Sequence, residues 1–349
     1  MSLAVKYRPS SFDDVVEQNS VKTILKHQLE TGTLQHAYLF VGSAGCGKTT
    51  CARIFANEIN KGQGTPIEID AASHNGVDDV RAIIDDSKLQ SIDSEYKCFV
   101  LDEVHMLSTQ AWNAMLKLLE EPPAKSVFIM CTTNPEKIPQ TILSRVQRYD
   151  FQKISTLGIV QRLKYVCDHE GIARFSDNGK TEGYEKYALQ SALEYIAKLA
   201  NGGMRTAISL MDKCLSYSNQ LTVQNVVDAL GVADYSEYVQ LAQAMLMRSE
   251  ADAVDVLEKV RNSGKDIKQF IKGYLEFCLD VCKYCACRSF AYIKIPNTTD
   301  YKQLLDRWVG CAVQFHRFVG VLINLNAELK WEQDPFTLAE ATILLECAE

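Results

Sequence analysis

Residues Val41–Thr50 read V-G-S-A-G-C-G-K-T-T and fit the phosphate-binding pattern G-x-x-x-x-G-K-[ST]. The apolar run Ala37–Val41 before them predicts a buried strand, and apolar residues at helical spacing from Thr49 to Ile59 predict a helix after them. A glycine-rich turn between a strand and a helix N-terminus presents backbone N–H groups and a partial positive charge to phosphate oxygens. The sequence therefore predicts a site for a nucleoside triphosphate.

Two side chains of this turn carry specific expectations. Lys48 is expected to reach the β- and γ-phosphates, and the Thr49 hydroxyl is expected to hold Mg2+. The remaining residues expected around the phosphates are Gly42, Ser43, Gly45, Cys46, Gly47 and Thr50.

Composition places the chain among ordinary globular proteins. Of its 349 residues 47% are hydrophobic and 23% are charged, and this length favours two or three domains. We identify no apolar run of membrane-spanning length and no N-terminal signal, so the twelve cysteines are expected to be reduced thiols in a cytoplasm. The net charge of −7 argues against general coating of nucleic acid but allows a local basic groove.

The order of predicted elements indicates an α/β domain followed by helical ones. Strands at Ala37–Val41, Ile67–Ile69, Cys98–Leu101 and Val127–Cys131 alternate with helices, which favours a parallel sheet covered on both faces. Residues 10–14 are interpreted as a helix start before a helix at about Val21–Leu29, and Arg174–Glu185 as a loop insertion. Long helices are expected at Tyr235–Met247, Ala251–Val260, Ile267–Cys287 and Tyr301–Glu328. The predicted domains are 1–153, a helical lid at 154–231 and a helical domain at 232–349.

A second motif ends the strand Cys98–Leu101 with two acids, Asp102 and Glu103. The carboxyl end of a parallel strand lies at the sheet edge where ligands bind. Asp102 is expected to bind Mg2+, and Glu103 to polarise the attacking water as general base. The adjacent Glu favours a hydrolysing ATPase over a protein that only binds nucleotide.

Two further polar features follow the strand Val127–Cys131. Thr132, Thr133 and Asn134 could hydrogen-bond the γ-phosphate or the attacking water. Arg145 ends the next short helix, and an arginine can balance transition-state charge from the same chain or a neighbour. Taken alone, Arg145 is interpreted as a surface ion-pair residue.

The order of these motifs resembles the bacterial clamp-loader ATPase subunit, DNA polymerase III gamma/tau, with its replication factor C relatives. The resemblance covers most of the chain, and its motifs are specific in combination. The matching segments are Y-R-P (7–9), F-D-D-V-V-E-Q (12–18), H-A-Y-L-F-V-G (36–42), I-E-I-D-A-A-S (67–73), L-D-E-V-H-M-L (101–107), L-L-E-E-P-P (118–123), T-T-N-P-E-K-I-P-Q-T-I-L-S-R (132–145), G-G-M-R-T-A-I-S-L-M-D (202–212) and L-K-W-E-Q-D-P (329–335).

The resemblance implies a fold and roles for individual residues. It implies an AAA+ domain with an all-α lid and an all-α collar, ATP with Mg2+, and an oligomeric ring of five subunits. Thr133 would be a sensor of the γ-phosphate, Arg145 a finger in the neighbour's ATP site, and Arg205 a lid contact to the γ-phosphate. His105 is interpreted as structural rather than catalytic. Residues at the adenine would be Tyr7, Arg8 and Val15–Val16.

Partners and location also follow from the resemblance. It implies other clamp-loader subunits, a sliding clamp and primer–template DNA as partners, with no membrane, in a bacterial cytoplasm or from a bacteriophage. DNA phosphates would face helix N-termini such as the one after Asn75-Gly76.

The chain departs from the family pattern in four places. Asn57–Pro66 holds no cysteine where the family usually has a four-cysteine zinc insert, so no zinc is expected there. Val146 replaces the cysteine of S-R-C, the lid carries the extra Arg174–Glu185 segment, and a long C-terminal tail of the tau type is expected to be absent.

The cysteines Cys278, Cys282, Cys285 and Cys287 form a cluster on a predicted helix. A soft-metal site is one interpretation. Packing of the collar is the favoured one, because thiolates from a single helix cannot readily surround a tetrahedral ion.

The sequence thus predicts an ATP-hydrolysing clamp-loader subunit that opens the clamp and loads it onto DNA. Two rivals stay open: a structural subunit of the same assembly that does not hydrolyse ATP, and another AAA+ motor such as a branch-migration helicase. Lys48, Thr49, Asp102 and Glu103 argue against the first, and the W-E-Q-D-P ending argues against the second.

Overall fold

The computed structural model describes residues 2–172, 183–230 and 235–348. These residues form two compact units. Unit 1 contains residues 2–172 and Ile196–Asp212, and unit 2 contains residues 183–195, 213–230 and 235–348. Of the predicted insertion, positions 174–182 lie outside the described residues, and a helix begins at Gly183.

Unit 1 is built on a five-stranded, all-parallel sheet in the order β2-β3-β4-β1-β5. The strands are β1 (Ala37–Val41), β2 (Ile67–Asp70), β3 (Lys97–Asp102), β4 (Ser126–Thr132) and β5 (Gln147–Asp150). In register, Val41 at the end of β1 lies beside Thr132 of β4. The predicted parallel α/β fold is confirmed, and the loops that follow β1, β3 and β4 meet at one edge.

Strand β5 is absent from the sequence-based prediction. Its residues Gln147 and Arg148 are exposed, while Tyr149 is buried. A short polar edge strand pairs on one side only, so its sequence lacks the apolar run that identified the central strands.

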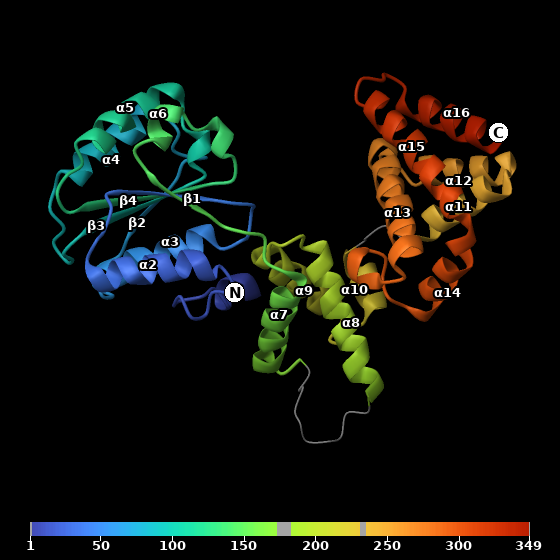
Figure 1. Cartoon of the computed structure of the whole chain (residues 1–349), viewed down its shortest axis with the longest axis horizontal. Coiled ribbons are helices and arrows are strands. Elements are labelled where there is room, and N and C mark those ends of the chain that lie inside the picture. The colour runs from blue at the N-terminus through green and yellow to red at the C-terminus, as the bar shows by residue number, and fades with distance from the viewer. Residues whose placement is uncertain (1, 173–182, 231–234, 349) are drawn as a thin grey trace. The chain divides into compact units, whose positions relative to one another are not determined.

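Helices cover both faces of this sheet (Figure 1). On one face α2 (Asn19–Thr31) and α3 (Lys48–Ile59) bury apolar residues such as Leu25 and Phe55 against Phe40. On the other, α4 (Val77–Ser87) and α5 (Thr109–Glu120) bury Val80 and Met115. The other helical segments of this unit are α1 (Leu3–Lys6), η1 (Val104–Met106), η2 (Pro135–Lys137), α6 (Gln140–Leu143) and α7 (Thr156–Glu170).

The N-terminal segment differs from one expectation. Residues 10–14 form turns instead of a helix start, with the Ser11 hydroxyl donating to Asp14 at 2.8 Å. The helix begins later, at Asn19. A Ser–Asp hydrogen bond of this kind competes with helix formation, because it offers the backbone a local alternative.

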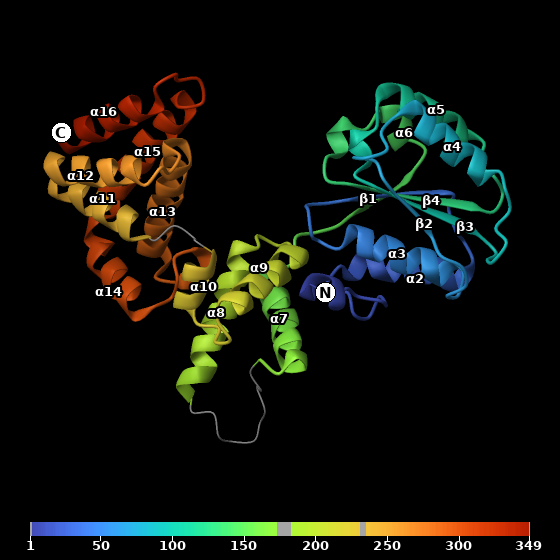
Figure 2. The same cartoon turned by 180° about the vertical axis from the view of Figure 1, so that it is seen from behind.

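All regular secondary structure among the described residues of unit 2 is helical. Figure 2 shows α13 (Ile267–Cys287) beside α15 (Ala312–Glu328), and the two helices bury Tyr274, Phe315 and Phe318 in one core. The remaining helices of the chain's second half are α8 (Gly183–Leu199) and α9 (Met204–Tyr217), which contribute to both units, α10 (Val223–Leu230), α11 (Tyr235–Met247), α12 (Glu250–Asn262), η3 (Phe290–Tyr292), α14 (Thr299–Trp308), η4 (Val309–Cys311) and α16 (Pro335–Ala348).

The chain is helical over the expected stretch Tyr301–Glu328, but the short 3-10 helix η4 divides this stretch into α14 and α15. This whole stretch, Thr299–Glu328, is long and apolar enough by length and composition to cross a membrane, with a mean hydropathy of 1.2 in its most apolar window. The expectation of no such run is therefore too strict. Phe315, Phe318 and Leu322 of α15 nevertheless lie in the core of unit 2, as in a core helix of a folded domain.

The cysteine cluster lies on α13. Cys278 and Cys282 are buried in the core, whereas Cys287 is exposed. Among the described residues no group of three or more His, Cys, Asp or Glu side chains is placed to hold a metal ion. Burial is what raises the pKa of Cys282 to about 11, as expected of a thiol packed among apolar side chains.

Candidate nucleotide-binding site

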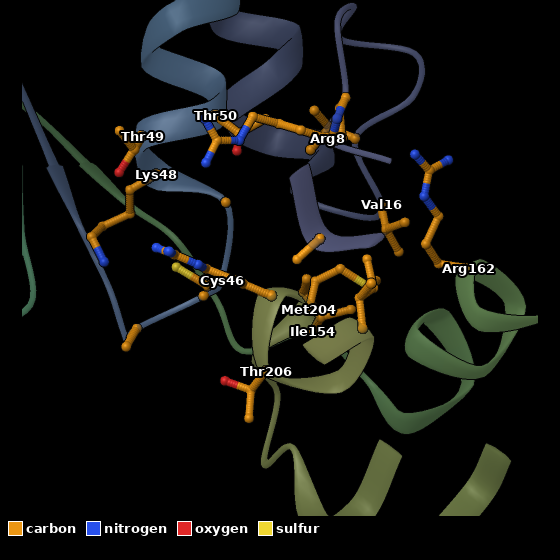
Figure 3. Close-up of a pocket in the computed structure, with 18 of the residues that line it drawn as sticks. Arg8, Val16, Cys46, Lys48, Thr49, Thr50, Ile154, Arg162, Met204 and Thr206 are labelled. Atoms are coloured by element: carbon orange, nitrogen blue, oxygen red, sulfur yellow. The ribbon is translucent and has the colours of Figure 1, made fainter. Parts of the chain in front are cut away.

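A pocket of about 260 Å³ lies in unit 1 at the turn between β1 and α3 (Figure 3). Its walls come from the N-terminal segment, the glycine-rich turn, the end of β3 and the start of α9. Thirteen of the residues predicted from sequence line it: Tyr7, Arg8, Val15, Val16, Gly45, Cys46, Gly47, Lys48, Thr49, Thr50, Asp102, Glu103 and Arg205.

The glycine-rich turn adopts the conformation that its glycines allow. Gly45 and Gly47 have φ of +75° and +108°, in the region that side chains with a Cβ rarely enter. Helix α3 starts at the next residue, Lys48, so its N-terminal N–H groups face the turn. The predicted Gly42 and Ser43 do not line the pocket; their carbonyl oxygens accept hydrogen bonds from Lys48 Nζ at 2.9 and 3.0 Å.

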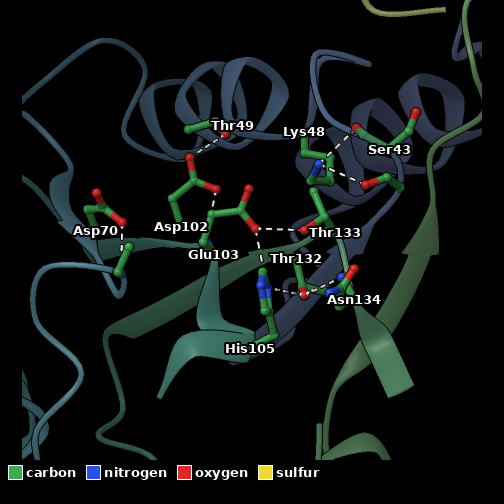
Figure 4. Close-up of polar contacts among 12 residues, drawn as sticks. Ser43, Lys48, Thr49, Asp70, Asp102, Glu103, His105, Thr132, Thr133 and Asn134 are labelled. Carbon is green, nitrogen blue, oxygen red and sulfur yellow. Dashed lines mark hydrogen bonds and ion pairs between the residues drawn. The ribbon is translucent and has the colours of Figure 1, made fainter. Parts of the chain in front are cut away.

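Thr49 and Asp102 meet although they lie 53 positions apart in the chain. The Thr49 hydroxyl donates to Oδ2 of Asp102 at 2.7 Å (Figure 4). A hydroxyl and a carboxylate side by side offer oxygen ligands, which Mg2+ prefers. The donor set therefore fits Mg2+.

Glu103 lies beside them with its backbone in the left-handed region, at φ 47° and ψ 43°. Its backbone N–H donates to Asp102 Oδ1 at 3.0 Å, and its side chain is 35% exposed and lines the pocket. The predicted Thr133 does not line the pocket itself; it reaches the site by donating its hydroxyl to Glu103 Oε2 at 3.1 Å.

The start of helix α9 closes another side of the pocket. The backbone N–H of Met204 donates to the carbonyl of Gly45 at 2.9 Å, and Arg205 follows it into the pocket. Burial lowers the pKa of Arg8, with a further contribution from the positive charges of Arg53 and Arg205. Such a concentration of cations suits a ligand with several negative charges.

The N-terminal segment is hydrogen-bonded to helix α7. The Tyr7 hydroxyl donates to Glu170 at 2.6 Å, and Arg162 donates to the Tyr7 carbonyl at 3.0 Å. Burial and the hydrogen bond to Glu170 raise the pKa of Tyr7 to about 12, so its hydroxyl keeps its proton at neutral pH. Tyr7 and Arg8 are thereby held at the pocket wall.

Sequence reasoning missed several residues that build this pocket. Ile154 and Arg162 line it without belonging to a motif, while Met204 and Ile208 belong to the segment 202–212 but were given no role. Gln18 is buried and joins the turn to the segment after β5, since its amide donates to the carbonyl of Gln152 at 2.7 Å. The buried polar side chain of Gln18 gives no local signal in the sequence, because its partners are 28 and 134 positions away.

Arg145 lies apart from this pocket. It follows α6, is 36% exposed, and donates to Glu120 at 2.8 Å and to the Thr141 carbonyl at 2.7 Å. Its guanidinium therefore lies at the surface of unit 1, where it is held by an exposed ion pair of small energy and by hydrogen bonds within its own loop.

Comparison with known proteins places the chain in a family. It is 33% identical to DNA polymerase III subunit tau of Bacillus subtilis, over 98% of this chain and 62% of that protein. It is 32% identical to DNA polymerase III subunit gamma of Buchnera aphidicola, over 79% of this chain and 78% of that protein. The chain belongs to the DNA polymerase III gamma/tau family. The family resemblance inferred from the motifs is confirmed.

Other matches agree with this assignment. A family model described as DNA polymerase III, delta subunit, matches residues 17–74 and 65–155 of this gamma/tau chain. Among solved structures, the RuvB Holliday junction branch migration motor of Thermotoga maritima matches 68% of this chain and 79% of its own, with a TM-score of 0.52 and 19% identity. At this identity the similarity shows a shared fold alone. The chain spans 62% of the length of the Bacillus subtilis tau subunit.

Proposed function

We propose that this gamma/tau chain is an ATP-hydrolysing subunit of a sliding-clamp loader that opens the clamp and loads it onto primer–template DNA during replication. One observation carries the proposal. Lys48 and Thr49 at the start of α3, Asp102 and Glu103 at the end of β3, and Arg205 at the start of α9 line one pocket in a chain of this family. A non-hydrolysing subunit would have no need of all five.

Binding roles follow from the geometry of the pocket. Lys48 and the N–H groups of the turn bind the phosphates, and Tyr7, Arg8 and Val16 bind at the nucleobase. Thr49 and Asp102 hold Mg2+, whose positive charge offsets that of the phosphates. Arg205, at the start of α9, contacts the γ-phosphate. The position of the lid then depends on whether the γ-phosphate is bound.

In this proposal Glu103 is the general base for hydrolysis. As the oxygen of the attacking water bonds to the γ-phosphorus, Glu103 accepts a proton from that water. The bond from the γ-phosphorus to the bridging oxygen breaks, and ADP leaves with the electron pair. Thr133 directly follows β4, donates a hydrogen bond to this carboxylate, and orients it or the water.

Arg145 completes the site of a neighbouring subunit. Its exposed guanidinium does not line the pocket of its own chain, which fits a residue that acts in trans. An arginine that acts in trans requires an oligomer, and the family resemblance implies a pentameric ring or spiral of clamp-loader subunits in the bacterial cytoplasm. Its chain divides into the AAA+ domain 1–153, the lid 154–231 and the collar 232–349.

The test measures ATP hydrolysis by the chain assembled with its partner subunits, with and without primed DNA and the cognate clamp. Arg145→Ala is compared with Arg148→Ala, a second exposed arginine with a surface ion pair, to Asp150. We expect DNA plus clamp to stimulate the wild type and Arg148→Ala. Arg145→Ala should bind ATP normally but lose about 10³-fold in rate.

If the wild-type rate of ATP hydrolysis is the same with and without DNA and clamp, the proposal is wrong. Strand separation by a hexamer would favour the branch-migration motor instead. ATP binding without hydrolysis under any condition would favour the structural subunit.

A further inference from the structure

His105 makes a contact that no motif explains. Its Nδ1 lies 3.3 Å from Glu103 Oε2 and 3.2 Å from Thr132 Oγ1 (Figure 4). The His105 side chain is 9% exposed and lies on η1, which the buried Val104 anchors in the core of unit 1. The same Oε2 also accepts the Thr133 hydroxyl. One carboxylate oxygen is thus contacted from two elements, η1 and the end of β4.

These contacts determine which ring nitrogen carries the proton. An ionised carboxylate can only accept hydrogen bonds, so a nitrogen that faces Glu103 Oε2 must be a donor. Protonation of His105 on Nδ1 would satisfy both contacts, and the donor and acceptor roles at this ring follow from that tautomer. Thr132 Oγ1 then accepts from His105 as well as from the backbone N–H of Asn134 at 3.1 Å, which uses both of its lone pairs.

The backbone of Glu103 is fixed independently. Its N–H donates to Asp102, and its carbonyl accepts from the Met106 N–H at 2.9 Å. A glutamate in the left-handed region persists only where surrounding contacts hold it. With the backbone held, the direction of the carboxylate depends on what its side-chain oxygens contact.

We propose that His105 is a positioning residue for hydrolysis: with Thr133 it anchors Oε2 of Glu103, so that Oε1 is left to take the proton of the attacking water. The inference rests on the proposed function, since it assigns a role relative to Glu103 as general base. His105 itself does not line the pocket. A carboxylate free to rotate would spend less time in the productive direction, which lowers kcat and leaves ATP binding unchanged.

Replacing His105 by residues with amide side chains tests the positioning role while changing the packing little. In His105→Asn the amide nitrogen lies near the position of Nδ1, whereas in His105→Gln it lies near that of Nε2. We expect His105→Asn to keep kcat within about threefold of wild type, and His105→Gln and His105→Leu to lose about 10- to 100-fold. The Kd for ATP should stay within about twofold in all three. Equal losses of kcat in His105→Asn and His105→Gln, or a wild-type kcat in His105→Leu, would overturn the proposal.

Nitrogen NMR of the histidine rings gives a readout apart from activity. The chain has six histidines, so the His105 signal is assigned by comparison with His105→Asn. We expect the Nδ1-protonated tautomer in the full-length protein, and loss of that preference in Glu103→Ala. A wild-type His105 protonated on Nε2 contradicts the proposal. If the wild type fails to hydrolyse ATP yet shows the Nδ1 tautomer coupled to Glu103, the proposed function falls while the anchoring stands.

Discussion

The backbone N–H of Met204 lies 2.9 Å from the carbonyl oxygen of Gly45, so the first residue of helix α9 is hydrogen-bonded to the glycine-rich turn. The contact is close because neither neighbour has a side chain at this point. A Cβ built on Gly45 would lie 3.2 Å from the Cα of Gly203. A change in the conformation of the turn when nucleotide binds would therefore also move the start of α9.

Replacing Gly45 by alanine should weaken ATP binding. The substitution forces a side chain into φ +75° and against Gly203, and strain of this kind costs about 1–3 kcal/mol. We expect the Kd for ATP, measured by calorimetry, to rise about tenfold or more. Gly32→Ala is the matched control, because Gly32 has φ +68° with nothing within 4 Å. It should lower the melting temperature without changing the Kd; an equal Kd change in both variants would refute the role of the contact.

Mixing two inactive variants should restore part of the ATPase activity. Lys48→Ala loses the phosphate contact but keeps Arg145, while Arg145→Ala keeps an intact pocket of its own. If the arginine acts on a neighbour, a ring that contains both variants has some complete sites. The rate of an equal mixture is compared with that of each variant alone. No recovery in the mixture, with assembly verified by mass measurement, would mean that Arg145 acts within its own chain or not at all.

The cysteines should differ sharply in the rate at which an alkylating reagent modifies them. Burial raises the pKa of Cys46, and it raises that of Cys51 to about 12, from an ordinary value of 9.0. Only the thiolate reacts, and a raised pKa means less thiolate at any given pH below it. Iodoacetamide at pH 8 should therefore modify the exposed Cys287 and leave Cys46 and Cys51 unmodified in the native protein. Peptide mass spectrometry checks this, and rapid labelling of Cys46 would show that the turn opens readily.

Two helical glycines of unit 2 should respond in opposite directions to alanine. A Cβ on Gly273 of α13 would lie 2.1 Å from the Tyr238 hydroxyl oxygen, so Gly273→Ala should lower the free energy of unfolding by about 1–3 kcal/mol. Gly320 of α15 has nothing within 4 Å, and Gly320→Ala should raise it by up to about 1 kcal/mol, because alanine favours the helix. Urea unfolding of both variants is the measurement. Destabilisation by Gly320→Ala would show that α15 is covered by another surface.

Much of the fold was predictable because its signals are local. The buried runs of β1, β3 and β4 are continuous stretches of apolar residues, and the apolar residues of α3 and α13 recur at helical spacing. Strand β5 and the break between α14 and α15 escaped prediction. An edge strand needs only one apolar face, and the break at η4 interrupts a sequence that is favourable for helix throughout.

By itself the sequence determined the chemistry that is available: a glycine-rich turn with Lys48 and Thr49, and acids at the end of a strand. It did so because each motif needs only neighbours in the chain. Tertiary structure alone decided which groups meet, such as His105 with Thr132, Gln18 with Gln152, and Arg162 with Tyr7. Those meetings depend on the parallel order of strands and on helix packing, which bring together residues that carry no signal of one another along the chain.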